Sequence, residues 1–244
     1  MKEWITGRNP VYEVLRAERR NVFRLWVAKG VEPAPRLNEI LRQAQKRHLK
    51  IENVPRTQLD RLGENHQGIA IEVSGYPYRD FQDILALAEK QGNDLLVLIL
   101  DRLQNPQNFG TLLRTAEATG VHGVILPLAR TVTVTPAVVH ASAGASEHLF
   151  ITQMNLAQAL NALKAAGVWV VGLEESSEAK HVEDMNLNGP MAVVVGNEGE
   201  GIRQLIRRSC DEIVRLPMIG KIESLNAAVA GSIILYKIYL SRQK

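Results

Sequence analysis

The stretch Asp94-Leu-Leu-Val-Leu-Ile-Leu100, followed directly by Asp101-Arg-Leu-Gln-Asn-Pro-Gln-Asn-Phe-Gly-Thr-Leu-Leu-Arg114, decides the fold class of this chain. The continuous apolar run is typical of a strand that is buried on both faces of a parallel sheet. A helix is expected over residues 111–119, and Gly120 suits its C-cap. Ligands bind beyond the carboxyl ends of the strands in an open α/β sheet, so we expect chemistry in the loop between this strand and this helix.

The remainder of the second half alternates strands with helices. Strands are expected at 123–126, 148–152, 168–173, 191–195 and 212–216, and helices at 136–143, 156–166, 201–209 and 225–241. This rhythm predicts a doubly wound α/β domain. The last helix is apolar on nearly all sides between Ala227 and Leu235. We therefore expect it to be buried within the domain or against a partner subunit.

Residues 1–74 predict a separate small α/β domain. Helices are expected at 9–20, 36–48 and 57–62, and strands at 22–27, 49–54 and 69–73. Ser74-Gly-Tyr-Pro77 breaks this pattern and marks the boundary. The small domain carries 14 Lys and Arg against nine Asp and Glu, a balance of +5, whereas the whole chain carries +3. This excess favours a polyanion partner, although an unevenly charged solvated surface would give the same count.

Composition excludes several classes of protein. Of the 244 residues, 45% are hydrophobic and 23% are charged, which is typical of a globular chain rather than a disordered one. The uncharged stretch 227–236 is much shorter than the ~20 residues that span a bilayer. The first residues show no apolar signal core, and the single Cys210 excludes an intramolecular disulfide. We expect a cytoplasmic protein without a membrane partner. The six histidines show no metal-ligand spacing, so no metal is expected.

The first loop that could carry chemistry is 101–114. Asn108 is expected to cap the following helix, and Gly110 would allow a ligand to approach its first turn closely. Arg114 lies among apolar neighbours on that helix. Taken alone, this pattern favours a capped helix with a surface arginine.

The second loop, Val195-Gly-Asn-Glu-Gly-Glu-Gly201, has three glycines within six residues. Its spacing is neither that of a dinucleotide-binding loop nor that of a phosphate-cradling loop. The two carboxylates suit a cationic or hydroxyl-bearing ligand, and an acidic helix start explains them equally well.

The third loop runs from Leu216-Pro-Met218 to Ser224-Leu-Asn226. Ser224 is expected to be an N-cap, which would place Asn226 in the first turn of a buried helix. A buried amide must be paired, so Asn226 is either a specific functional element or one internally bonded residue.

The three loops together resemble the three motifs of the SpoU/TrmH branch of the SPOUT methyltransferases over roughly residues 94–241. In addition, Gly7-Arg-Asn-Pro-Val11 and His66-Gln-Gly-Ile-Ala70 resemble the substrate-binding domain of the subgroup that methylates guanosine in large-subunit (23S) ribosomal RNA. The resemblance implies an L30e-like RNA-binding α/β domain at 1–74, a linker and connecting helix at 75–92, and a SPOUT α/β domain with a C-terminal trefoil knot at 93–244.

The resemblance also implies an activity, the methylation of an RNA ribose 2′-hydroxyl with S-adenosyl-L-methionine and without a metal. The implied catalytic residues are Asn108, Arg114, Glu198, Ser224 and Asn226. The implied cofactor-binding residues are Gly196, Asn197, Gly199, Leu216, Met218, Ile219, Ser224 and Leu225. RNA would contact Arg8, Asn9 and Arg114. Arg114 would clamp a phosphate rather than act as a base, because a guanidinium stays charged. A homodimer is implied, and DNA is not an expected partner.

Alternatives remain open at this level. The same chemistry could act on transfer RNA, or the protein could bind RNA and assist ribosome assembly without catalysis. A nicotinamide-dependent dehydrogenase is disfavoured, because no dinucleotide-binding loop follows the first buried strand. The charged pair in Lys221-Ile-Glu223 departs from the smaller or more neutral residues that the third motif leads us to expect.

Overall fold

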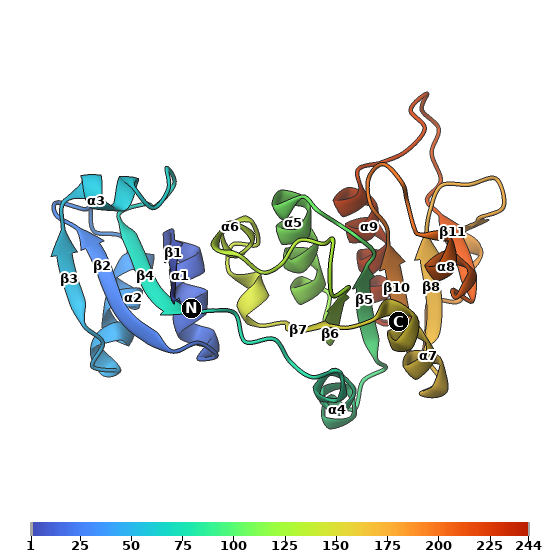
Figure 1. The fold of residues 1–244 in the computed structure, drawn as a ribbon, viewed down its shortest axis with the longest axis horizontal. Helices are drawn as coiled ribbons and strands as arrows, with labels where there is room; N and C mark the ends of the chain where they lie inside the picture. Colours follow the sequence, from blue (N-terminus) through green and yellow to red (C-terminus); the bar gives the residue numbers. More distant parts are fainter. Residues whose placement is uncertain (1, 244) are drawn as a thin grey trace. The chain divides into compact units, whose positions relative to one another are not determined.

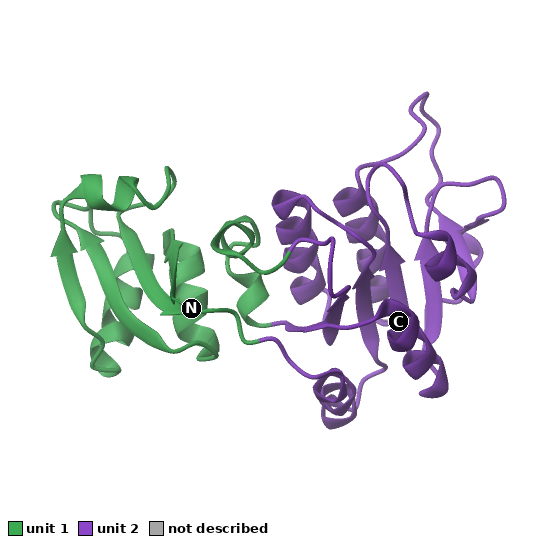
Figure 2. Ribbon diagram, in the orientation of Figure 1, with its two compact units in different colours: residues 1–77, 133–148 green, residues 78–132, 149–244 purple. Residues whose placement is uncertain are grey.

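The computed structural model describes residues 2–243 and divides them into two compact units. Unit 1 contains the chain up to Pro77 together with Thr133–His148, and unit 2 contains Tyr78–Val132 and the chain from Leu149 onward (Figure 2). The segment Thr133–His148 therefore packs with the N-terminal residues, although sequence analysis assigned it to the domain 93–244.

Unit 1 is built on a four-stranded sheet with the order β1-β4-β2-β3 (Figure 1). The strands are β1 (Lys2–Thr6), β2 (Val22–Ala28), β3 (Ile51–Val54) and β4 (Ile69–Ser74), and the helices are α1 (Arg8–Ala17), α2 (Pro35–Lys46) and α3 (Arg56–Asp60). β4 runs antiparallel to both β1 and β2, and β2 runs parallel to β3. β1 was not predicted from the sequence, because only Ile5 within it is fully buried. It is a strand because it pairs with β4, which lies more than sixty residues later in the sequence.

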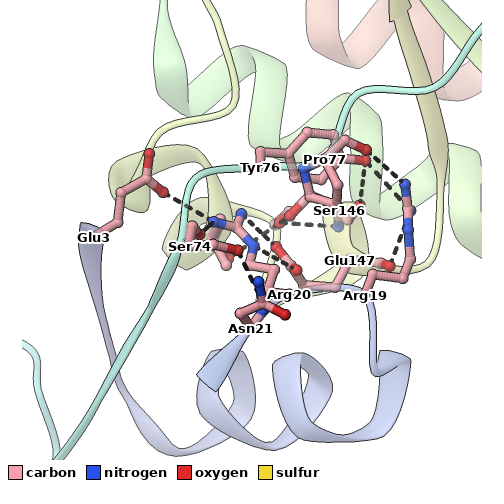
Figure 3. A network of polar contacts seen from close by, with 11 residues as sticks. Glu3, Arg19, Arg20, Asn21, Ser74, Tyr76, Pro77, Ser146 and Glu147 are labelled. Atoms are coloured by element: carbon pink, nitrogen blue, oxygen red, sulfur yellow. Dashed lines mark hydrogen bonds and ion pairs between the residues drawn. The ribbon is translucent and has the colours of Figure 1, made fainter. Parts of the chain in front are cut away.

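A buried ion pair fastens the distant segment of unit 1, which holds α6 (Pro136–Ala141) and the 3₁₀ turn η1 (Ala145–Glu147). The guanidinium of Arg20 donates from Nε and Nη2 to the two carboxylate oxygens of Glu147, each at 2.8 Å (Figure 3). Its Nη1 donates to Glu3 at 2.9 Å and to the Ser74 carbonyl at 3.1 Å. Arg20 and Glu147 have side chains only 0% and 1% exposed. Tyr76 adds a hydrogen bond to the Ser146 carbonyl.

Unit 2 is built on a seven-stranded sheet with the order β7-β6-β5-β10-β8-β11-β9, in which every pairing is parallel. The strands are β5 (Leu96–Leu100), β6 (Gly123–Leu126), β7 (Phe150–Gln153), β8 (Trp169–Leu173), β9 (Lys180–His181), β10 (Met191–Val195) and β11 (Glu212–Arg215). Sequence analysis missed the two-residue β9, which is a strand only through its pairing with β11. Together with unit 1, this sheet confirms the predicted α/β fold class.

Helices cover both faces of the sheet in unit 2. α4 (Phe81–Gln91), α7 (Leu156–Ala165) and α8 (Gln204–Arg208) contribute to one core cluster with the inward residues of β5, β8 and β10. α5 (Pro106–Ala118) packs against α9 (Ala227–Ser241), and Gly231 gives Leu112 the room for this contact. α9 buries one face and exposes Val229, Tyr236 and Leu240 on another. Among the described residues, no helix is long and apolar enough to cross a bilayer.

We predict that Arg20→Ala destabilises the protein by about 3–5 kcal/mol, because it leaves the buried Glu147 carboxylate without a counter-charge. Arg16→Ala is the matched control, since Arg16 is 63% exposed and lies 3.6 Å from Glu13. The control should change stability by less than about 0.5 kcal/mol. Urea denaturation followed by circular dichroism measures both. Adding Glu147→Gln to Arg20→Ala should recover part of the loss, and equal midpoints for the two arginine variants would contradict the prediction.

Candidate functional site

The loop between β5 and α5 ends at a capped helix, but the cap differs from the predicted one. The side chain of Asn105 accepts from the backbone N–H groups of Gln107 and Asn108. Pro106 occupies the first helical position, where its fixed φ favours helix initiation, so the cap is the residue before it. The prediction that Asn108 is the N-cap is therefore wrong. This leaves the Asn108 side chain available for a contact outside its own helix.

A chain of hydrogen bonds joins three predicted site residues, which lie in the first turn of α5, in the glycine loop after β10 and at the N-cap of α9. The Asn108 Nδ2 group donates to Oε1 of Glu198, and Asn226 Nδ2 donates to Oδ1 of Asn108 at 3.3 Å. Glu198 and Asn226 are exposed, and Asn108 is half-buried. The structure thus brings together two amides and a carboxylate, of which Asn108 lies 90 residues from Glu198 and 118 residues from Asn226 in sequence. These side chains can hold and orient a polar group at the surface.

Asn226 also begins α9. Its Oδ1 accepts from the backbone N–H groups of Ala228 at 2.9 Å and Val229 at 3.3 Å, so Asn226 is the N-cap. The predictions that Ser224 caps this helix and that Asn226 lies buried in its first turn are both wrong. The helix starts two residues later than expected, and the exposed Asn226 is satisfied by its capping bonds.

The glycine loop after β10 is closed on itself. Asn197 forms an antiparallel bridge with Gly201, and its side chain accepts from the Gly199 N–H at 2.9 Å. A Cβ on Gly196 would lie 2.2–2.5 Å from backbone atoms of Gly201 and Ile202, so no other residue fits without moving the loop. The Asn197 Nδ2 group donates to the Arg102 carbonyl at 3.1 Å, which ties this loop to the loop after β5.

A second tie between the same two loops was missed by sequence analysis. The Asp101 carboxylate is fully buried and accepts from the backbone N–H of Arg203 at 2.8 Å and from its Nε at 2.7 Å. A buried carboxylate at a strand end requires such a partner, but the sequence does not show where the partner lies.

A cavity of about 600 Å³ opens at this edge of the sheet, a volume within the usual range for a small-molecule site. Seven predicted cofactor-binding residues line it, namely Gly196, Asn197, Gly199, Leu216, Met218, Ser224 and Leu225. The predicted catalytic Glu198 lines it as well. Ile219 is fully exposed and does not line it. Lys221, Ile222 and Glu223 are also exposed.

The cavity wall carries charges that sequence analysis did not assign to the site. Arg207 Nε donates to Glu174 at 3.0 Å, and its Nη2 donates to Glu178 at 3.0 Å. The bond to Glu178 makes the largest contribution to a raised pKa of the Arg207 guanidinium, and the bond to Glu174 comes next. The guanidinium therefore stays charged. Arg215 pairs with Glu175 at 3.3 Å. With Glu198 and Glu200 also on the wall, five carboxylates face two guanidinium groups, and this balance favours a cationic ligand.

The predicted RNA-binding residues lie in both units. Arg114 is exposed on α5 and makes no hydrogen bond or ion pair with the rest of residues 2–243, and it does not line the cavity. In unit 1, the Arg8 guanidinium donates to the backbone carbonyls of Gln67 and Glu32. Arg8 therefore braces two loops, and Asn9 lies in the first turn of α1.

Neither a metal nor a thiol nucleophile is provided by the described part of the chain. No three His, Cys, Asp or Glu side chains within residues 2–243 are grouped so that they could hold a metal ion. Burial raises the pKa of the Cys210 thiol to about 12, so the thiol is protonated at neutral pH.

Comparison with known proteins places this site in a family. The model of the SpoU rRNA methylase family matches residues 95–236, and the model of the RNA 2′-O ribose methyltransferase substrate-binding domain matches residues 4–79. The chain belongs to the SpoU methyltransferase family. It is therefore an RNA 2′-O-ribose methyltransferase, and the cavity and the Glu198–Asn108–Asn226 chain lie within the residues that the methylase model matches.

Individual relatives agree with this assignment. The YacO protein of Bacillus subtilis, assigned to the TrmH family of tRNA/rRNA methyltransferases, is 37% identical over 242 residues, covering 98% of this chain and 96% of its own. The SpoU methyltransferase AviRb of Streptomyces viridochromogenes, solved in complex with AdoMet, is 26% identical with a TM-score of 0.83, covering 100% of this chain and 91% of AviRb. The A. aeolicus TrmH/SpoU tRNA-modifying enzyme is 27% identical with a TM-score of 0.56, covering 66% of this chain and 83% of its own.

We predict that Gly196→Ala weakens binding of S-adenosylmethionine, the molecule bound in AviRb, by roughly tenfold or more. The added methyl group must push apart the backbone of the loop that forms the cavity wall. Gly199→Ala serves as the matched variant in the same loop, because its Cβ would meet only the Asn197 Oδ1 atom at 3.6 Å. We expect it to bind within about threefold of the wild type. Isothermal titration calorimetry measures both, and equal losses would contradict the steric argument.

Proposed function

We propose that this SpoU methyltransferase uses S-adenosyl-L-methionine to methylate the 2′-hydroxyl of a guanosine ribose in large-subunit ribosomal RNA. The observation that carries the proposal is the shared edge where the glycine-loop cavity meets the Glu198–Asn108–Asn226 chain. When bound, the cofactor supplies an electrophilic methyl group on a sulfonium centre. The excess of carboxylates on the cavity wall fits such a cation, and AviRb supports the same cofactor.

The protein's own residues would position the reactants. The backbone around Gly196, Leu216 and Leu225 would hold the adenosine part, and Ser224 lies on the same wall. The amides of Asn108 and Asn226 and the Glu198 carboxylate would orient the ribose and the loops around it. Orientation of this kind contributes much of the rate in a direct displacement, because the hydroxyl oxygen must meet the methyl carbon in line with the leaving sulfur.

Arg114 would clamp the phosphate next to the target ribose. Its side chain is exposed and lacks a protein partner within residues 2–243, as a residue reserved for substrate requires. A planar guanidinium can hold a phosphate with two parallel hydrogen bonds and retains its charge throughout. The proton of the 2′-hydroxyl would pass to solvent water, since a charged guanidinium cannot accept it.

Ribosomal rather than transfer RNA is supported by the first unit. The substrate-binding model covers residues 4–79, and residues 1–74 carry a charge of +5. The A. aeolicus tRNA-modifying enzyme aligns with only 66% of this chain, so about a third of this chain has no counterpart in that enzyme. Transfer RNA remains the second candidate, because the YacO assignment includes both RNA classes.

The same proposal includes a homodimer, a C-terminal trefoil knot and a cytoplasmic location. Val229, Tyr236 and Leu240 expose an apolar face of α9 that a second copy would cover. The deep knot would surround the cavity formed by the loops at 196–201 and 216–226. A single cysteine suits a reducing compartment.

We predict that the wild type transfers a labelled methyl group from S-adenosylmethionine to 23S ribosomal RNA, and that Arg114→Ala lowers the rate by roughly a hundredfold or more. Total ribosomal RNA, total transfer RNA and ribosomal precursor particles are offered in parallel, and the label is mapped to its nucleotide. Cofactor affinity should be unchanged in Arg114→Ala, because Arg114 does not line the cavity.

The outcomes separate the parts of the proposal. Label only in transfer RNA would overturn the substrate. Absence of label in both RNAs and in precursor particles would overturn the catalytic proposal. Near-full activity of Arg114→Lys would overturn phosphate clamping by the planar guanidinium, because lysine supplies the charge without that geometry.

A further inference from the structure

The loop after β6 displays two side chains that the proposed mechanism does not use. Leu128 is 69% exposed, and Arg130 is exposed with a φ of +58°. No hydrogen bond or ion pair joins Arg130 to another residue in the described range 2–243. Residues other than glycine adopt such a φ at a cost, and positions of this kind concentrate at functional sites.

The base of this loop is fixed. The Leu103 carbonyl accepts from the Val132 N–H at 2.8 Å and from the Thr131 hydroxyl at 3.1 Å. Leu103 is fully buried, and Val132 is only 8% exposed. Arg130 therefore projects from a backbone whose next two residues are pinned to the loop after β5. A guanidinium held in this way loses less conformational entropy on binding than one on a mobile loop.

A second arginine lies in the loop after β5, next to the Leu103 carbonyl that accepts from Thr131 and Val132. Arg102 precedes Leu103 and has a φ of +62°. Its carbonyl accepts from Asn197 of the glycine loop, and its Nη1 lies 3.9 Å from the carboxylate of Glu200. A 3.9 Å contact with a carboxylate that is 78% exposed is a weak, solvent-screened pair. The charge of Arg102 is thus available to an anion next to the cavity.

We propose that Arg130, together with Arg102, binds RNA backbone phosphates that flank the target ribose. This inference rests on the proposed function and assigns a substrate-binding surface beyond Arg114. β5 and β6 are paired in parallel, so their following loops lie at the same sheet edge as Asn108. Phosphate contacts fix the register of a nucleic acid without reading its sequence, and arginine forks suit this task. The exposed Leu128 offers an apolar contact to a base beside these phosphates.

The test compares Arg130→Gln and Arg102→Gln with Lys90→Gln. Lys90 is an exposed cation in the last turn of α4, which leads into the amino end of β5, so its loss removes the same charge at the opposite sheet edge. Equilibrium binding of a 23S ribosomal RNA transcript is measured by filter retention over a range of salt concentrations. S-adenosylmethionine binding is measured separately by calorimetry.

We expect Arg130→Gln to raise the RNA Kd roughly tenfold and to reduce the salt slope by about 1, since one phosphate contact is lost. Arg102→Gln should act in the same direction but less strongly, because of Glu200. Lys90→Gln should leave RNA affinity within about twofold. All three variants should bind S-adenosylmethionine as the wild type does, and this shows that the cavity is intact.

The inference is overturned if Arg130→Gln matches Lys90→Gln in both RNA affinity and salt slope. It is also overturned if the wild type does not bind RNA. Failure of the proposed function gives a different result, in which the wild type binds RNA with the expected salt slope and Arg130→Gln weakens it, but no methyl group is transferred. Binding without turnover would therefore keep the phosphate site and remove the reaction.

Discussion

The parallel pairing of β10 with β5 sets the positions of the two loops that form the core of the candidate site. Val195 pairs with Leu100, so the loops that follow these two strands begin side by side although about 95 residues separate them in sequence. Asn197 and Asp101 then fix the two loops to each other through bonds to Arg102 and Arg203. Because both ties are made by atoms at the strand ends, they hold the glycine loop without filling the cavity. The Asn108 contact with Glu198 adds a bond between the first turn of α5 and the glycine loop.

Net charge alone gives an incomplete description of unit 1. Several of its arginines are used inside the unit, since Arg20 is buried against Glu147 and Arg8 holds two backbone carbonyls. Arg24 bonds to Glu72 and lies over the rings of two tryptophans. These guanidinium groups stabilise the fold, and only the remaining cations can meet a polyanion. The Arg20–Glu147 pair also explains why a segment from the middle of the chain belongs to the unit formed by the N-terminal residues.

The carboxyl edge of unit 2 combines two electrostatic environments. Carboxylates exceed guanidinium groups on the cavity wall, and this suits a cationic cofactor. Arg114 and Arg130 lie outside that wall, are exposed, and have no partner within the described residues. Arg130 follows β6 at this sheet edge, so the acidic pocket and an unpaired arginine there would hold a sulfonium ligand and a phosphate chain without pairing one with the other. Under the proposed function, this separation of charge is what allows cofactor and RNA to be bound independently.

Buried apolar runs and local spacing were enough to predict the α/β class, the parallel sheet and the three segments of the candidate site. The sequence did not determine the helix caps. The N-cap of α5 is Asn105 rather than the predicted Asn108, because Pro106 begins the helix. The N-cap of α9 is Asn226 rather than the predicted Ser224, because that helix begins at Ala227. β1 and β9 were also not predicted, because they are strands only through their partners. The ties of Asp101 to Arg203 and of Arg20 to Glu147 join residues more than a hundred positions apart. Such pairs can be identified only in the folded chain, because a buried charge requires a partner but nothing local in the sequence says where that partner lies.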